Sequence, residues 1–263
     1  MDTTTWTLEQ VKDRISKGQE IDERVVDIGQ NTVVKFADNV SAEEGEATMF
    51  IARMTSVPVA RIYAILRDES DGVTYIVQEK LRGEPLINHL PTLDTATRDA
   101  LALELQKILN ELATLDKGHM GLFGRPSQYG SGILAKFDPP VPPIESPEDF
   151  LRWLPHNVRD NYGRDEAPLP TGIFDFSRPP IFSHGDFVPE NILIEDGHVT
   201  GIIDWAYAGW YPYFWNDYIA RRRSTLMAFQ DGKWSQMVGQ MMQPFPEEFR
   251  AFQQLYYRAD SLL

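Results

Sequence analysis

The sequence predicts an α+β fold, because strand-like segments joined by short turns and a helix with clear apolar spacing occupy different stretches of the chain. Strand-like segments flank three turn signals, at Gly29-Gln30-Asn31, Asp71-Gly72 and Asp196-Gly197. Between the last two, residues 99–115 place leucine and isoleucine at three- and four-residue spacing, which is typical of a buried helix. With 263 residues and 42% hydrophobic content, the chain can form one large domain or two smaller lobes.

A lysine lies on the second strand of the first hairpin. Residues 23–28 and 32–36 flank the turn, and alternation along the strand puts Val33 and Lys35 on one face. Such a lysine can neutralise phosphate from within a pocket, or it can be a surface side chain on an edge strand. These two interpretations stay open at this point.

A helix is expected directly after this hairpin. Residues 41–44 form a capping box, and apolar residues then recur at helical spacing, namely Ala47, Phe50, Ile51 and Met54. Two further strands are expected over residues 57–65 and 74–79, and glycine and proline in residues 80–86 end the second of them. The first 80 residues therefore predict a small sheet with one helix.

The third hairpin brings two hard oxygen ligands together. If the Asp196-Gly197 turn closes, residues whose numbers sum to 393 face one another, so Asn191 lies opposite Ile202. Asp204 then lies diagonally across from Asn191 on the same face. An amide oxygen and a carboxylate suit Mg²⁺, which completes its shell with water and substrate phosphates. A metal site of this type implies a nucleotide.

Asp186 adds a third candidate, because it precedes Asn191 by the Asp-to-Asn spacing of a kinase catalytic loop. The order His184-Gly185-Asp186, then Asn191, then a hairpin ending in Ile203-Asp204-Trp205 resembles the aminoglycoside phosphotransferase and choline kinase family. Residues 203–212 resemble in particular the fungal-type members of this family. That resemblance implies a protein-kinase-like fold with two lobes. Residues 1–81 would form the nucleotide-binding lobe, and residues 82–263 a larger, mostly helical lobe that carries the catalytic loop and binds the acceptor.

The resemblance also implies the chemistry of the site, which is transfer of the γ-phosphoryl group of ATP, or of GTP, to a hydroxyl of a small molecule. Asp186 would orient and deprotonate the hydroxyl, while Asn191 and Asp204 would hold Mg²⁺. His184 is expected to support the loop by packing and hydrogen bonding.

Further residues are assigned to the nucleotide by the same resemblance. Lys35 would pair with phosphate and Val33 would pack on the base, while Glu79 and Leu81 would offer main-chain atoms to the adenine. Kinases hold the lysine with one helix glutamate, for which Glu43, Glu44 and Glu46 are all candidates. The family's Glu-Ala-x-x-Met-x-Phe-Ile run selects Glu46, while helical geometry alone also permits Glu43.

Two departures from the family pattern keep other functions open. Between Gly18 and Lys35 only Gly18 and Gly29 are glycines, so a kinase-type glycine loop is missing. Ala206 stands where the family usually carries a glutamate, and Asp217 could compensate for it or bind a cationic acceptor. The alternatives are a kinase-like protein that binds a nucleotide or metabolite without turnover, and an enzyme that uses the cleft for non-phosphoryl biosynthetic chemistry.

Composition narrows the classes of partner. The formal charge of −14 argues against nucleic acid binding and could favour a cationic acceptor by steering. The chain has no cysteine, and neither a basic start followed by an apolar run nor about 18 consecutive apolar residues is found. We therefore expect a soluble, cytoplasmic protein that does not bind a membrane.

Two remaining stretches have unusual composition. Residues 126–180 contain 11 of the 18 prolines, so we expect an irregular segment with helices near 147–154 and 157–162. It would shape the acceptor pocket or form a surface insertion. Seven aromatics between Trp205 and Trp215 favour core packing over a ligand cage.

Overall fold

The computed structural model describes residues 5–115, 146–151, 172–226 and 232–260. They form two compact units, one from Met1–Asn88 with Pro189–Ala206 and one from His89–Val188 with Tyr207–Leu263. Strands and helices are both present, so the predicted α+β class is confirmed. The first unit is therefore completed by a short segment that returns from far along the chain.

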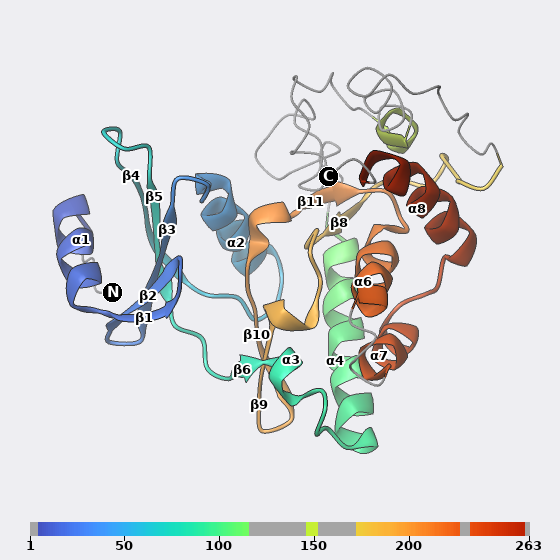
Figure 1. Cartoon of the computed structure of the whole chain (residues 1–263), viewed down its shortest axis with the longest axis horizontal. Helices are drawn as coiled ribbons and strands as arrows, with labels where there is room; N and C mark the ends of the chain where they lie inside the picture. Colours follow the sequence, from blue (N-terminus) through green and yellow to red (C-terminus); the bar gives the residue numbers. More distant parts are fainter. Residues whose placement is uncertain (1–4, 116–145, 152–171, 227–231, 261–263) are drawn as a thin grey trace. The chain divides into compact units, whose positions relative to one another are not determined.

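The first unit contains a five-stranded sheet and two helices that pack on it (Figure 1). In chain order its elements are α1 (Leu8–Lys17), β1 (Gln19–Asp22), β2 (Val25–Gly29), β3 (Thr32–Ala37), α2 (Ala42–Met54), β4 (Ile62–Arg67), β5 (Thr74–Glu79), β6 (Glu84–Pro85), α3 (Leu86–His89), η1 (Pro189–Asn191), β9 (Ile192–Glu195), β10 (His198–Ile202) and η2 (Trp205–Tyr207), of which α3 and η2 continue into the second unit.

The sheet is antiparallel throughout, with strand order β1-β2-β3-β5-β4. Gln30 and Asn31 both have positive φ angles, of 54° and 56°, so the predicted first turn closes as a type I′ hairpin. β5 matches the expected strand, whereas β4 begins at Ile62 and leaves residues 57–61 outside the strand. The central position of β3 removes the alternative that Lys35 lies on an edge strand.

Helices α1 and α2 cover opposite faces of the sheet (Figure 1). Val11 of α1 packs in a cluster with Val34, Tyr75 and Val77, while α2 contacts the face that carries Ile76. The sheet thus carries two helices, and the expectation of one helix is wrong. The missed signal lies before α1, where the Thr7 and Gln10 side chains each bond the other's backbone in a capping box.

A second sheet, of order β10-β9-β6, joins the returning segment to the first unit. Its formation depends on Gly83, which has a φ of +92° and whose added Cβ would lie 2.5 Å from the Ile194 carbonyl oxygen. Only glycine permits this backbone approach. The lobe boundary after residue 81 stays a prediction, while the described contacts group β9 and β10 with residues 1–88.

The β9–β10 hairpin departs from the expected register. Pairs His198–Glu195 and Val199–Ile194 follow it, and Asp196 and Gly197 adopt the positive φ angles of the predicted turn. A bulge between Val199 and Gly201 then shifts the pairing by one residue, so Ile202 faces Ile192. The predicted pairing of Asn191 with Ile202 is therefore wrong, because Asn191 has already left the strand for η1.

The second unit is mainly helical. Its elements are α4 (Thr95–Ala113), β8 (Ile181–Ser183), β11 (Gly209–Tyr211), α6 (Trp215–Leu226), α7 (Lys233–Met241) and α8 (Pro246–Asp260). The predicted buried helix corresponds to α4, which begins after the N-cap Asp94 and contacts α7. Strands β8 and β11 pair with each other.

Most of the aromatic run that follows Trp205 is core, as predicted. Tyr211, Phe214 and Trp215 are buried with Tyr218 and Phe252 in one cluster. The Tyr211 and Trp215 rings stack at 4.8 Å between centroids. Tyr207 is the exposed member of this run, with 42% of its surface accessible.

The proline-rich segment is described only in part. Residues 147–151 are helical, within the first predicted helix, and the second, near 157–162, lies outside the described residues. Among the described helices, none combines the length and the apolar character that crossing a membrane requires.

Candidate active site

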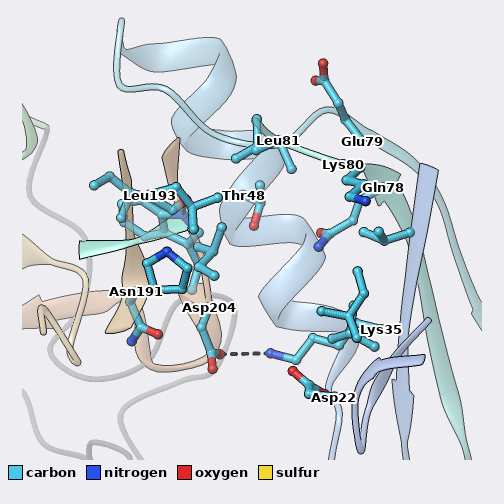
Figure 2. A pocket seen from close by; sticks show the side chains of 18 of the residues that line it. Asp22, Lys35, Thr48, Gln78, Glu79, Lys80, Leu81, Asn191, Leu193 and Asp204 are labelled. Carbon is cyan, nitrogen blue, oxygen red and sulfur yellow. Dashed lines mark hydrogen bonds and ion pairs between the residues drawn. The ribbon is translucent and has the colours of Figure 1, made fainter. Parts of the chain in front are cut away.

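The first unit encloses a pocket with a volume of about 450 Å³, a size typical of small-molecule sites. Its walls come from the β1–β2 turn, β3, α2, the segment that follows β5, and the β9–β10 hairpin with the residues on either side of it. Figure 2 shows Lys35 and Asp204 pointing toward one another across it, with Asn191 beside Asp204. Predicted site residues from distant parts of the chain thus share one pocket.

Lys35 is buried and paired with two carboxylates. Its Nζ lies 2.7 Å from Glu44 Oε1 and 2.9 Å from Asp204 Oδ1. Burial alone would lower the pKa of Lys35, but the two carboxylates outweigh that effect and raise it. Burial also raises the pKa of Glu44, although Lys35 opposes this shift. The lysine is therefore held as a cation in the pocket.

The glutamate that holds Lys35 is Glu44, so the selection of Glu46 is wrong. Glu46 is exposed on the outer side of α2, whereas Glu44 is buried together with Ala47, Thr48 and Ile51. Positions i, i+3, i+4 and i+7 form one helical stripe, and this spacing could have selected Glu44. Instead, the expected stripe extended to Met54, which is 50% exposed.

The capping box predicted at the start of α2 is also changed by this pairing. The helix begins as expected after Ser41, but the Ser41 side chain makes no capping bond. Glu44 occupies the position that would bond back to Ser41, and its carboxylate points at Lys35 instead. A local signal has been overridden by a tertiary contact.

Asn191 and Asp204 line the same pocket, although not through the predicted strand pairing. The main-chain oxygen of Asn191 accepts a hydrogen bond from the Ile203 N–H at 3.0 Å, which ties the end of η1 to the residue before Asp204. Asp204 has a φ of +63°, a left-handed conformation that non-glycine residues seldom adopt. This backbone turns its carboxylate toward Lys35. An amide and a carboxylate on one wall fit the hard oxygen ligands that Mg²⁺ takes.

Apolar side chains form another part of the pocket walls. Val33 lines the pocket, and its packing on a base stays a prediction. Ala60, Leu193 and Ile202 also line the pocket, although none of them was predicted to do so. Leu193 and Ile202 flank the turn in strands that read only as buried β-structure, so no sequence signal separated them from core residues. Together these side chains give the pocket an apolar surface.

The end of β5 and the segment that follows it contain the two residues predicted to contact a base through their main chain. Glu79 and Leu81 both line the pocket. The Glu79 N–H already donates to the Arg61 carbonyl oxygen at 2.9 Å. The Glu79 carbonyl oxygen is therefore the main-chain group of this residue that could accept a hydrogen bond from a ligand. Next to it, the Lys80 N–H donates to the Asn31 carbonyl oxygen.

His184, Gly185 and Asp186 belong to the second unit. His184 is fully buried, its Nδ1 accepts a hydrogen bond from the Asp186 N–H at 3.3 Å, and its ring packs against Phe187. Gly185 has a φ of +82°, and an added Cβ would lie 2.0 Å from the Tyr207 carbonyl oxygen. Only glycine fits between the histidine and the aspartate.

Asp217 has partners within the second unit. It is 2% exposed, its Oδ1 lies 2.6 Å from Arg221 Nε, and its Oδ2 accepts from the Phe245 N–H at 3.0 Å. Burial raises the pKa of Asp217, which the Phe245 N–H and Arg221 oppose. These contacts give Asp217 a structural role in joining α6 to the start of α8.

Solved structures of aminoglycoside phosphotransferases share this fold. A thermostable mutant of APH(4)-Ia in a ternary complex with ADP and hygromycin B aligns at a TM-score of 0.60 and 13% identity, over 98% of this chain and 93% of that one. The GDP complex of wild-type aminoglycoside 2'-phosphotransferase-IIIa aligns at 0.58 and 17% identity, over 93% and 85%. The GDP and kanamycin complex of APH(2")-IIia aligns at 0.54 and 18% identity, over 93% and 85%.

At these identities the likeness shows the fold, and the predicted protein-kinase-like fold is confirmed. No curated protein sequence matches the chain. The model of the phosphotransferase enzyme family, abbreviated APH, matches residues 14–218. This match includes every residue assigned above to the pocket and to the His184–Asp186 loop, and by it the chain belongs to the phosphotransferase enzyme family.

Proposed function

We propose that the protein transfers the γ-phosphoryl group of ATP to a hydroxyl group of a small molecule. The observation that carries this proposal is the buried Lys35, paired with Glu44 and Asp204 in a pocket that Asn191 also lines. A buried cation beside hard oxygen ligands suits a phosphate–magnesium complex. The family match supports the same class of reaction.

Different pocket residues would bind different parts of the nucleotide. Lys35 binds phosphate oxygens, Val33 and Leu193 pack against the base, and the main chain at Glu79 and Leu81 hydrogen-bonds its edge. Asn191 and Asp204 would hold Mg²⁺, and the ion would supply positive charge to the phosphates when bound. GTP can occupy the same pocket, and neighbouring structures are described with ADP and with GDP.

Asp186 would act as the base for the acceptor. The acceptor hydroxyl oxygen attacks the γ-phosphorus, the bond from the γ-phosphorus to the bridging oxygen of ADP breaks, and the hydroxyl proton passes to the Asp186 carboxylate. Structural neighbours are described with hygromycin B and kanamycin, and the net charge of −14 would also favour a cationic acceptor such as an amine-bearing sugar.

The test is ADP release with Mg²⁺-ATP and a panel of hydroxyl acceptors that includes aminoglycosides, choline and neutral sugars. We expect acceptor-dependent ADP release, reduced at least about 100-fold in Asp186→Asn because the base is lost. Asp186→Asn should still bind ATP. The matched control is Asp175→Asn, which removes an exposed carboxylate from the same unit and should keep wild-type turnover.

The same assay separates the alternative functions. Product formation without any nucleotide would contradict phosphoryl transfer and favour the non-phosphoryl chemistry. Nucleotide binding without turnover across the panel would favour a binding protein. Wild-type turnover in Asp186→Asn would remove Asp186 from the role of base while leaving the reaction class in place.

A further inference from the structure

Three cations line the pocket among the described residues, and they differ in what they bind. Lys35 is paired with Glu44 and Asp204, and Lys80 Nζ lies 2.7 Å from Asp27 Oδ2. The guanidinium of Arg24 makes no hydrogen bond or ion pair with the described residues. One cation of the pocket is therefore left for a ligand.

The main chain of Arg24 is held by hydrogen bonds, although its side chain is exposed. Its N–H donates to Asp22 Oδ1 at 2.7 Å, and its carbonyl oxygen accepts from the Phe36 N–H at 2.9 Å. These bonds fix the turn between β1 and β2, where Asp22 and Arg24 line the pocket. The Arg24 charge also reaches the buried carboxylate of Glu44, since it opposes the rise that burial causes in the pKa of Glu44.

This turn occupies the place where a kinase-type loop would present glycine N–H groups to phosphate. Here the turn residues are Glu23 and Arg24, and the Arg24 N–H already donates to Asp22 at the end of β1. The pocket is also acidic, with five carboxylates against three cations among its lining residues. A polyphosphate entering it needs positive charge beyond what Lys35 provides.

We propose that Arg24 binds the nucleotide phosphates through its guanidinium and so replaces the missing glycine loop. The inference rests on the proposed nucleotide site and assigns to it a residue from outside the family pattern described above. A guanidinium offers a planar fork of N–H donors that matches phosphate oxygens. Because the Arg24 guanidinium has no ion pair among the described residues, it can bind phosphate without breaking an ion pair with any of them.

The experiment compares dissociation constants for ATP and for adenosine, each with Mg²⁺, by calorimetry on the full chain. Arg24→Gln should weaken ATP binding about 10- to 100-fold, the range for losing a charge-assisted hydrogen bond. Adenosine should bind Arg24→Gln as it binds the wild type, because it has no phosphate. Arg24→Lys should recover part of the loss.

The matched control is Arg53→Gln, which removes an exposed arginine from α2 in the same unit but outside the pocket. It should bind ATP as the wild type does. Equal ATP binding by Arg24→Gln and wild type would overturn the role of Arg24 and leave the nucleotide site standing. If the wild type bound neither ATP nor GTP, the proposed function would fail together with this inference.

Discussion

Lys35 keeps its charge in a buried position because two carboxylates face its Nζ. Taking a charged group out of water is costly, and a partner offsets that cost only when the geometry is close. Glu44 is at least as buried as Lys35, so each charge depends on the other. The pair binds β3 to α2 while holding a cation in the pocket.

Removing Lys35 alone should destabilise the protein. Lys35→Met leaves the Glu44 carboxylate buried without its cation, so the free energy of unfolding should fall by about 3 kcal/mol. The double variant Lys35→Met/Glu44→Met should recover much of this loss, because two apolar side chains replace the pair. Urea unfolding measures the free energy of unfolding of the wild type and of both variants.

A control distinguishes Glu44 from its exposed neighbour. Glu46→Gln changes a carboxylate on the same helix and should leave the free energy of unfolding within about 0.5 kcal/mol of wild type. If Glu46→Gln destabilised the protein as much as Glu44→Gln did, the assignment of Glu44 as the partner of Lys35 would be contradicted.

At the scale of elements, the pair Asp27–Lys80 joins β2 to the segment that follows β5. The hydrogen bond from Lys80, with help from the Gly29 N–H, lowers the pKa of Asp27. A carboxylate with a lowered folded-state pKa stabilises the protein above its unfolded-state pKa, and this contribution is lost as the pH falls through the folded-state pKa. The pair therefore supports this connection at neutral pH.

Lys80→Gln should consequently be less stable than wild type at neutral pH, by at most about 1 kcal/mol because Lys80 is half exposed. The difference should narrow progressively as the pH falls below about 4, the ordinary pKa of an aspartate in the unfolded chain, and toward the lower folded-state pKa of Asp27. Urea unfolding of both proteins from pH 7 down to pH 3 measures this difference in the free energy of unfolding. In a protein that already carries Asp27→Asn, Lys80→Gln should change the free energy of unfolding little at any pH. A large change there would mean that Lys80 stabilises the protein through another contact.

At the scale of the whole molecule, a ligand that binds the folded chain raises the melting temperature. At 100 times its dissociation constant, a nucleotide should stabilise the protein by about 2.7 kcal/mol. We expect this shift with ATP plus Mg²⁺, a smaller one with ATP alone, and loss of the Mg²⁺-dependent part in Asp204→Ala. Differential scanning calorimetry measures each shift from the same protein without ligand.

Asp204→Ala also removes a partner of Lys35, so its own melting temperature can fall before any ligand is added. Comparing each variant with its own unliganded state separates this loss from binding. A full Mg²⁺-dependent shift in Asp204→Ala would contradict the assignment of Asp204 to the metal. A shift that needs Mg²⁺ only when Asp204 is present would support it.

The sequence by itself determined the elements whose signals are local. The turns at Gln30-Asn31 and Asp196-Gly197, the buried stripe of α4 and the alternation that puts Val33 with Lys35 all depend on residues near one another in the chain. Such patterns reflect backbone geometry and a fixed repeat, so they survive into the folded protein. The resemblance to the family also rests on local spacing, that of Asp186, Asn191 and Asp204.

Only the tertiary structure decided which of three neighbouring glutamates reaches Lys35, where the β9–β10 pairing slips, and how residues 189–206 complete the first unit. Glu44 is selected by which face of α2 packs on the sheet, and the bulge near Gly201 is a departure that the turn does not encode. Arg24 gained its significance because Lys35 and Lys80 are already paired, a fact that depends on residues distant in sequence. Pairing of charges across a pocket is a property of the assembled fold, and it has no local signature.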